Sequence, residues 1–296
     1  MSLVGNQSAT GGVLLGIYEK ALRGNTLDEL FASARRAGFA FVDLSIDESP
    51  ERLARLRWTD VERQEVREAA RRHGVMIGGI CLSAHRSTAP GSSDPAQRAL
   101  ALEMMVDAID LCADLGASVL QIAGYYAYYE EPRDTARADY IEILRVGTHY
   151  AARRGIVLGL ENVDGTDVIS TAEALSIVDE IRSPWFHLYP DIGNFVVQSR
   201  EVASEVAAAA KHAVAWHVKE ARPGEPRRVP MGEGDVPWDA AFAALAAAQW
   251  NGRIMIEMWN DDDPESERIS AQARRFVEER LRRAGIAVLA PSSALS

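Results

Sequence analysis

The chain has 296 residues, of which 47% are hydrophobic and 25% are charged, a balance typical of a globular protein. Its 43 acidic side chains outnumber 32 basic ones, and the net charge of −11 argues against a general nucleic-acid-binding surface. The sequence has no apolar run approaching the roughly eighteen residues of a membrane span, and no cleavable signal sequence opens it. We therefore expect no nucleic-acid partner, no membrane partner and, by default, a cytoplasmic location.

Apolar runs that predict strands alternate along the chain with amphipathic segments that predict helices. The predicted strands are residues 13–18, 39–46, 75–83, 117–124, 156–163, 186–192, 213–219 and 253–259. The predicted helices are residues 26–37, 60–73, 95–115, 134–154, 171–181, 199–211, 238–249 and 264–284.

Eight strand-then-helix units without a break in composition predict an α/β protein, a single (β/α)8 TIM barrel over residues 13–285. A doubly wound sheet is the alternative, but no G-x-G-x-x-G pattern follows the first strand. Residues 1–12 are predicted to be a flexible leader and residues 286–296 a disordered tail. Cys81 and Cys112 lie in apolar stretches and are predicted to be reduced core thiols.

Four consecutive predicted strands end with a residue that can bind a metal. Glu161 stands in "LGLENV", Asp191 in "YPDIGN", His217 in "AWHVKE" and Glu257 in "MIEMW". Side chains alternate along a strand, so the residues two positions earlier share the same face. Those residues are small or apolar, as a crowded barrel interior requires: Gly159, Tyr189, Ala215 and Met255.

Three carboxylates and one imidazole form an oxygen-rich ligand set that suits one divalent ion, Mn²⁺, Mg²⁺, Co²⁺ or Zn²⁺. An ionised carboxylate such as Glu161 is expensive to bury alone, and a cation beside it offsets that cost. Each residue alone has a simpler interpretation, such as a core histidine or a buried salt bridge. Four at equivalent heights favour a metal site.

Together with these positions, five motifs resemble the L-ribulose-5-phosphate 3-epimerases of the xylose isomerase-like barrel superfamily. The motifs are "GIYEK" (16–20), "CLSAHR" (81–86), "PDIGN" (190–194), "HVKE" (217–220) and "GEGDV" (232–236). The resemblance covers roughly residues 13–285, and the substrate of this family is also described as L-xylulose 5-phosphate.

The resemblance implies an isomerase that inverts carbon 3 of a ketopentose phosphate. It implies that Glu161, Asp191, His217 and Glu257 bind the metal, and that Glu161 and Glu257 also form the acid–base pair. Deprotonation next to a carbonyl requires a stabilised enediolate, and inversion requires a proton carrier on each face of that intermediate.

An acidic protein that binds a phosphate ester needs a local cationic pocket. Candidates for substrate or phosphate contact lie near predicted strand ends: Ser83, His85, Arg86, Lys219, Glu19 and Asn194. His85 and Arg86 can also be a solvated loop pair, and Lys219 can polarise the substrate carbonyl instead. Glu19 can contact substrate or belong to a surface ion pair with Lys20.

Some positions depart from the family pattern and leave the sugar open. Ser87 and Thr88 follow the His-Arg pair in place of a basic residue and an aromatic, and Tyr126 stands where an acidic residue is usual. His187 is predicted to face inward below Asp191 as a structural or supporting group. The aromatic residues 125–129 can contact sugar or a second subunit, and a homodimer is an expectation from the resemblance alone.

Four other functions stay open at this point. An isomerase or 3-epimerase of an unphosphorylated ketose would use the same metal and carboxylates but would not need Arg86. A hexulose phosphate is a second substrate class, and a barrel that binds sugar without turnover is a third alternative. An endonuclease IV-like phosphodiesterase is disfavoured by the net charge of −11 and by only six histidines.

Overall fold

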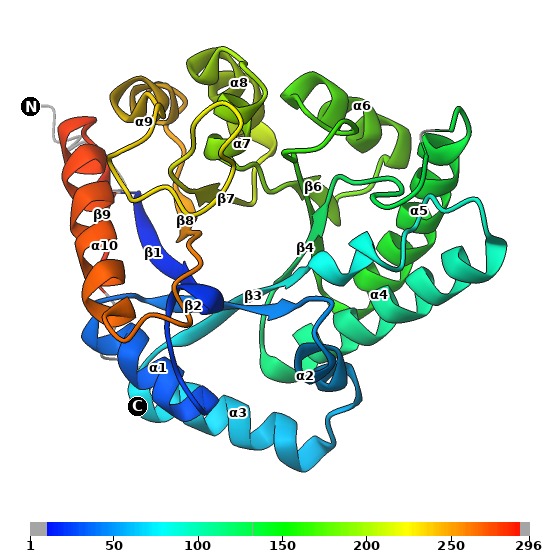
Figure 1. Cartoon of the computed structure of the whole chain (residues 1–296), viewed down its shortest axis with the longest axis horizontal. Coiled ribbons are helices and arrows are strands. Elements are labelled where there is room, and N and C mark those ends of the chain that lie inside the picture. Colours follow the sequence, from blue (N-terminus) through cyan, green and yellow to red (C-terminus); the bar gives the residue numbers. More distant parts are fainter. Residues whose placement is uncertain (1–10, 132, 291–296) are drawn as a thin grey trace, which may run out of the picture.

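The computed structural model describes residues 11–131 and 133–290, in which a ring of parallel strands is surrounded by helices (Figure 1). The strands are β1 (Gly12–Tyr18), β2 (Phe41–Ile46), β3 (Met76–Leu82), β4 (Val119–Ala123), β5 (Val157–Glu161), β6 (Phe186–Leu188), β7 (Ala215–Val218), β8 (Gly252–Ile256) and β9 (Ala287–Val288). The α-helices are α1 (Leu27–Arg36), α2 (Pro50–Leu53), α3 (Asp60–His73), α4 (Pro95–Leu115), α5 (Ala136–Arg154), α6 (Thr171–Ile181), α7 (Ile192–Val197), α8 (Val202–Ala209), α9 (Trp238–Ala247) and α10 (Ser266–Arg283).

The strands pair in the order β6-β5-β4-β3-β2-β1-β8-β7, and each pair of neighbours in this order is parallel. Two isolated parallel bridges, Leu188 with Ala213 and Asp191 with His217, join β6 to the β7 side and bring the ring close to closure. The predicted (β/α)8 barrel is therefore confirmed. Its closing bridge connects two of the residues predicted to bind metal.

Several predicted elements coincide with the observed ones. The predicted helices 60–73, 95–115 and 171–181 are α3, α4 and α6. The predicted strand 186–192 is wrong at its C-terminal end, because β6 stops at Leu188. Pro190 has no backbone N–H for a ladder, and the side chain of Asp191 accepts a hydrogen bond from the Gly193 N–H and starts α7.

The two chain ends differ from the prediction where they can be compared. β1 already begins at Gly12, inside the predicted leader, while residues 1–10 lie outside the described residues. Within the predicted tail, β9 pairs with β1, and the Leu289 N–H donates to the Val13 carbonyl at 2.8 Å. Residues 291–296 lie outside the described residues. Ile286 and this pairing attach residues 286–289 to the barrel, because Ile286 is buried in the core.

The main hydrophobic core lies between the ring of strands and the helices, and it includes the outward side chains of most strands. The two cysteines are free and buried, as predicted. Inside the ring, Gly159 leaves room for Tyr189, because a Cβ at position 159 would lie 2.9 Å from the Tyr189 Cβ. In the part of the chain that the structure describes, none of the helices combines the length and apolar composition needed to cross a membrane.

Candidate active site

The C-terminal ends of β5, β6, β7 and β8 bring the four predicted ligands together. Glu161 ends β5, Asp191 follows β6, His217 lies in β7 and Glu257 follows β8. One ligand atom of each lies within 4.8 Å of the other three, and all four side chains are buried or nearly so. These distances confirm that the four residues form one cluster. The sequence could not show this, because the cluster depends on how the strands are arranged in the barrel.

Asp191 has two tasks because it stands between a strand and a helix. Its Oδ1 accepts the Gly193 N–H at 2.8 Å and caps α7, while its Oδ2 lies 2.6 Å from Lys219 Nζ. The side chain of Asn162 fixes the backbone of Asp191: it accepts the Asp191 N–H at 2.8 Å and donates to the Asp191 carbonyl at 3.1 Å. Asn162 is a supporting residue that sequence reasoning missed, although it directly follows Glu161 in the "LEN" stretch.

Glu161 has a partner for each carboxylate oxygen. His217 Nδ1 lies 2.7 Å from Oε1, and Gln121 Nε2 donates to Oε2 at 2.6 Å. The same Nδ1 lies 3.9 Å from Glu257 Oε1. Gln121 was also missed, but its position in β4 amid apolar residues is the pattern of an inward polar group.

Lys219 connects two of the carboxylates. Its Nζ lies 2.6 Å from Asp191 Oδ2 and 3.3 Å from Glu257 Oε2. Gly193 makes this approach feasible, because a Cβ at that position would lie 2.5 Å from the Lys219 Cγ. Gly193 of "PDIGN" therefore leaves room for Lys219 of "HVKE", and the two motifs are in direct contact.

Burial disfavours the charged form of every side chain in this cluster, and neighbouring charges either outweigh or only partly offset its effect on each pKa. Burial lowers the pKa of His217, but the carboxylates of Glu161, Glu257 and Asp191 outweigh it and raise the value to about 9. Burial raises the pKa of Asp191 to about 7 although Lys219 opposes the shift. The pKa of Glu257 is lowered, because Lys219 and His217 outweigh the effect of burial. The cluster is thus stabilised by positive charge.

The four side chains fit a divalent cation. Ligand atoms about 2.1 Å from a metal lie roughly 3 to 4.2 Å from one another, and the observed limit of 4.8 Å requires only small side-chain adjustments. Three carboxylate donors and one imidazole suit the ions predicted from the sequence. The residues that would hold the ion are Glu161, Asp191, His217 and Glu257.

A cavity of about 270 Å³ opens above this cluster at the C-terminal side of the barrel. Its lining includes Glu161 and Glu257 together with four of the six residues predicted to contact substrate, which are Ser83, Arg86, Lys219 and Asn194. Ser83 and Arg86 lie in the short 3-10 helix η3 (Ser83–Arg86) that follows β3. The cavity therefore joins the carboxylates to part of the predicted cationic pocket.

The other two predicted contacts, His85 and Glu19, lie outside this lining. His85 is 2% exposed, and its Nε2 lies 3.1 Å from the Ala101 carbonyl oxygen, so it packs against α4. Glu19 accepts hydrogen bonds from Arg52 Nε at 2.9 Å and from Arg55 Nη1 at 2.5 Å, away from the central cavity. The sequence could not show where the His85 and Glu19 side chains point. Consecutive loop residues, such as His85 and Arg86, direct their side chains differently.

Two arginines that sequence reasoning did not select also line the cavity. Arg227 lies 3.1 Å from Asp164 Oδ2 and stacks over the Trp259 ring, with its Cζ 5.7 Å from the ring centroid. Arg228 lines the cavity as well, while Arg222 of the same loop lies outside the lining and pairs with Glu225 at 3.0 Å. The "RPGEPRR" loop after β7 is the only signal that could have pointed to them.

The sequence left open the roles of His187 and of the aromatic cluster, and the structure shows the contacts that each makes. His187 is partly exposed, and its Nε2 lies 3.1 Å from the Pro184 carbonyl oxygen, at the start of β6. Tyr125 lines the cavity and donates a hydrogen bond to Asp164. Tyr129 is 66% exposed. The aromatic residues thus divide between the cavity and the surface.

This fold, with its polar cluster at the C-terminal strand ends, is that of the xylose isomerase-like TIM barrel family, which matches residues 31–280. L-ribulose-5-phosphate 3-epimerase UlaE of Salmonella paratyphi C is 40% identical over 275 residues, which cover 92% of this chain and 96% of the relative. UlaE of Escherichia coli strain K12 / DH10B is 39% identical over the same shares. The chain belongs to the L-ribulose-5-phosphate 3-epimerase family within the xylose isomerase-like TIM barrels.

A solved structure supports the fold independently. The structure of D-allulose 3-epimerase from a Methylomonas species superposes with a TM-score of 0.76 over 91% of this chain and 98% of that one. At 22% identity this likeness concerns the fold alone. With its family, the chain is an epimerase of sugars, an enzyme of the isomerase class, as the resemblance implied.

Proposed function

We propose that this enzyme is a divalent-metal-dependent 3-epimerase of a ketopentose phosphate, interconverting L-ribulose 5-phosphate and L-xylulose 5-phosphate. The observation that carries the proposal is that Glu161 and Glu257 line one cavity directly above a four-ligand cluster. The related UlaE proteins, 39–40% identical, bear the name of this activity.

Inversion at carbon 3 needs two proton carriers, and the cavity provides two carboxylates from separate strands. Glu161 reaches it from β5 and Glu257 from β8, and β6 and β7 lie between these strands in the ring. One carboxylate accepts the carbon-3 proton and the other returns a proton to the opposite face. A divalent cation held by the four ligands would supply Lewis-acid stabilisation to the enediolate oxygen. Lys219 holds Asp191 and Glu257 in place.

The phosphate group is assigned to the η3 side of the cavity. Ser83 Oγ and Arg86 Nε are buried, and neither has a hydrogen-bond partner among the described residues. Arg86 Nε lies 3.4 Å from Glu48 Oε2, longer than a charge-assisted hydrogen bond. A phosphate could therefore take donors that the protein does not fully use. Arg227 and Arg228 add positive charge to the same lining.

The test is proton NMR in D₂O with the cation-loaded enzyme, using L-xylulose 5-phosphate and, separately, L-xylulose. Loss of the carbon-3 signal with appearance of the epimer from the phosphate ester is expected, and the free sugar should react far more slowly. Arg86→Ala should raise KM for the phosphate ester with little change in kcat. Arg222→Ala is the matched control, because Arg222 pairs with Glu225 outside the cavity lining.

The results separate the parts of the proposal. Equal turnover of ester and free sugar would contradict the phosphate assignment and favour an unphosphorylated ketose. Exchange in neither compound would contradict the assigned substrate. The predicted homodimer and cytoplasmic location stay predictions, which light scattering and cell fractionation can examine.

A further inference from the structure

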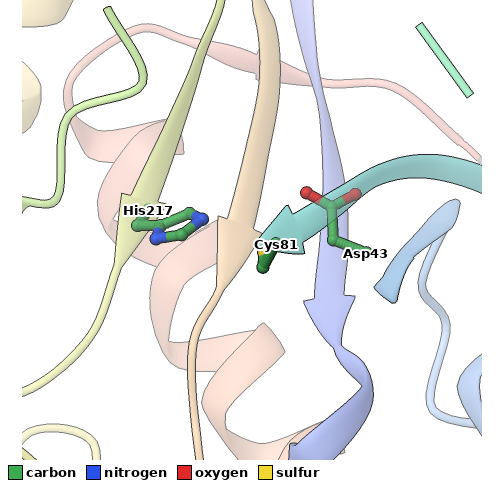
Figure 2. Close-up of side chains that lie close together, drawn as sticks. All are labelled: Asp43, Cys81 and His217. Carbon is green, nitrogen blue, oxygen red and sulfur yellow. The ribbon is translucent and has the colours of Figure 1, made fainter. Parts of the chain in front are cut away.

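A second polar cluster lies inside the barrel next to the first. Figure 2 shows the side chains of Asp43 (β2), Cys81 (β3) and His217 (β7) lying close together. One atom of each side chain lies within 4.8 Å of the other two, and all three residues are buried. Asp43 and Cys81 have no part in the chemistry proposed above, whereas His217 belongs to both clusters.

Asp43 and His217 each have one polar side-chain atom that is engaged with a neighbour and a second that is not. The Tyr189 hydroxyl donates to Asp43 Oδ2 at 2.6 Å, and His217 Nδ1 is engaged with Glu161 at 2.7 Å. Asp43 Oδ1 and His217 Nε2 remain, both buried and both without a hydrogen-bond partner in the described part of the chain. Buried polar atoms of this kind are expensive unless something satisfies them.

One atom of each of the three side chains lies within 4.8 Å of the other two, a spacing that suits one bridging water molecule. Two hydrogen bonds of about 2.8 Å that meet at a tetrahedral angle span about 4.5 Å. A buried water needs two to four polar partners, and this cluster offers three: an acceptor on Asp43, a ring N–H on His217 and the Cys81 thiol. Cys81 also lines the central cavity, which gives water a route in.

We propose that Asp43 is a positioning residue that holds the imidazole of His217 through one buried water molecule, which Cys81 also contacts. The inference rests on the cation site of the proposed function. A cation bound through Nδ1 requires the remaining ring proton on Nε2, and a carboxylate on that side favours this tautomer and ring orientation.

Tyr189 makes the arrangement rigid. Its hydroxyl holds Asp43, and its ring packs edge-on against the His217 ring with centroids 4.4 Å apart. Tyr189 fits there because position 159 is glycine. One tyrosine thus fixes both the carboxylate and the imidazole, so Asp43 and His217 keep their relative position.

The same three residues are also donors that zinc accepts, so a second cation is the competing occupant. That ion would have to share the imidazole of His217 with the first site and would require a ring without any proton. Water needs no such change, which is why we infer water.

Zinc binding to the full chain, measured by calorimetry with a competing chelator, tests the proposal. Asp43→Asn should weaken zinc binding about 10- to 100-fold, because the amide removes the charged acceptor while keeping the shape. Tyr189→Phe should weaken it less, since the ring contact with His217 remains. Thr148→Val is the matched control: it removes a buried hydroxyl on α5 that donates to the Leu144 carbonyl at 2.7 Å and should leave affinity unchanged.

A second readout distinguishes positioning from general damage. In the zinc-loaded protein labelled with ¹⁵N-histidine, the ring whose Nδ1 shifts on zinc binding should show a slowly exchanging Nε2 proton. That proton should exchange faster in Asp43→Asn. Should Asp43→Asn not fold, the same comparison is made with Tyr189→Phe.

Every result bears on the inference. Wild-type affinity and unchanged proton exchange in a folded Asp43→Asn protein would overturn it. So would a second zinc equivalent in the wild type that is lost in both Asp43→Asn and Cys81→Ala, because the cluster would then be a cation site. Failure of the wild type to bind any zinc would instead defeat the cation site of the proposed function.

Discussion

Glu161 and Glu257 are held by different partners, but the substitution of either one by glutamine is expected to lower kcat. Gln121 and His217 hold Glu161, whereas Lys219 lies against Glu257. Glu161→Gln or Glu257→Gln keeps the side-chain shape but removes a proton carrier. Each should lower kcat by about 10²- to 10⁴-fold with little loss of stability. Steady-state kinetics and thermal unfolding check this, and a near-normal rate in both variants would contradict the two-carboxylate mechanism.

His85 lies outside the cavity and does not make the substrate contact expected from the sequence. Its burial predicts instead how the stability of the fold depends on pH. Burial lowers its pKa to about 4, from an ordinary 6.5. The folded state therefore favours the neutral ring, and this stability is fully present above pH 6.5 and is lost as pH falls toward 4. Between pH 7.5 and pH 5 the loss should be about 2 kcal/mol.

Urea unfolding at these two pH values measures that loss. In His85→Leu the decrease between pH 7.5 and pH 5 should be smaller than in the wild type by this amount. His149→Leu is the control, because it removes an exposed histidine on α5. An identical decrease in the wild type and in His85→Leu would show that His85 does not titrate in this way.

At the scale of elements, the turn from β6 into α7 combines helix capping with ligand placement. Asp191→Asn and Asp191→Ala both remove the charge facing Lys219, so both should lose cation affinity and turnover. Asparagine can still cap α7, whereas alanine cannot, and Asp191→Ala should be less stable than Asp191→Asn by about 1 kcal/mol. Urea unfolding with chelator present measures the difference. Equal stability would mean that the cap observed at Gly193 contributes nothing.

At the scale of the whole molecule, cation binding should couple to folding, because the four ligands come from four separate strands that meet only in the closed barrel. A cation at 100 times its dissociation constant should stabilise the native state by about 2.7 kcal/mol. The melting temperature should rise with Mn²⁺ or Zn²⁺ in the wild type but not in Asp191→Asn. Chelator should abolish turnover and added cation should restore it. Full activity in excess chelator would defeat the Lewis-acid role.

The alternation of strands and helices could be predicted because it depends on local periodicity. The period of apolar residues and the glycines and caps at helix ends are properties of short segments, and α3, α4 and α6 were located to the residue. The four residues that cluster at the strand ends could also be predicted, because an acid or histidine at the end of an apolar strand has no other inexpensive place in a barrel.

What the sequence by itself determined, then, is the barrel, its family and the four residues that cluster at the strand ends. Only the tertiary structure decided which loop residues face the cavity. His85 and Glu19 turn to partners on α4 and α2, while Arg227 turns inward, because loop directions depend on packing against elements distant in sequence. Asn162, Gln121 and Asp43 were missed for the same reason: they approach Asp191, Glu161 and His217 only in the assembled barrel. Gln121 and Asn162 contact residues at the ends of neighbouring strands, whereas Asp43 on β2 approaches His217 on β7 across the barrel interior.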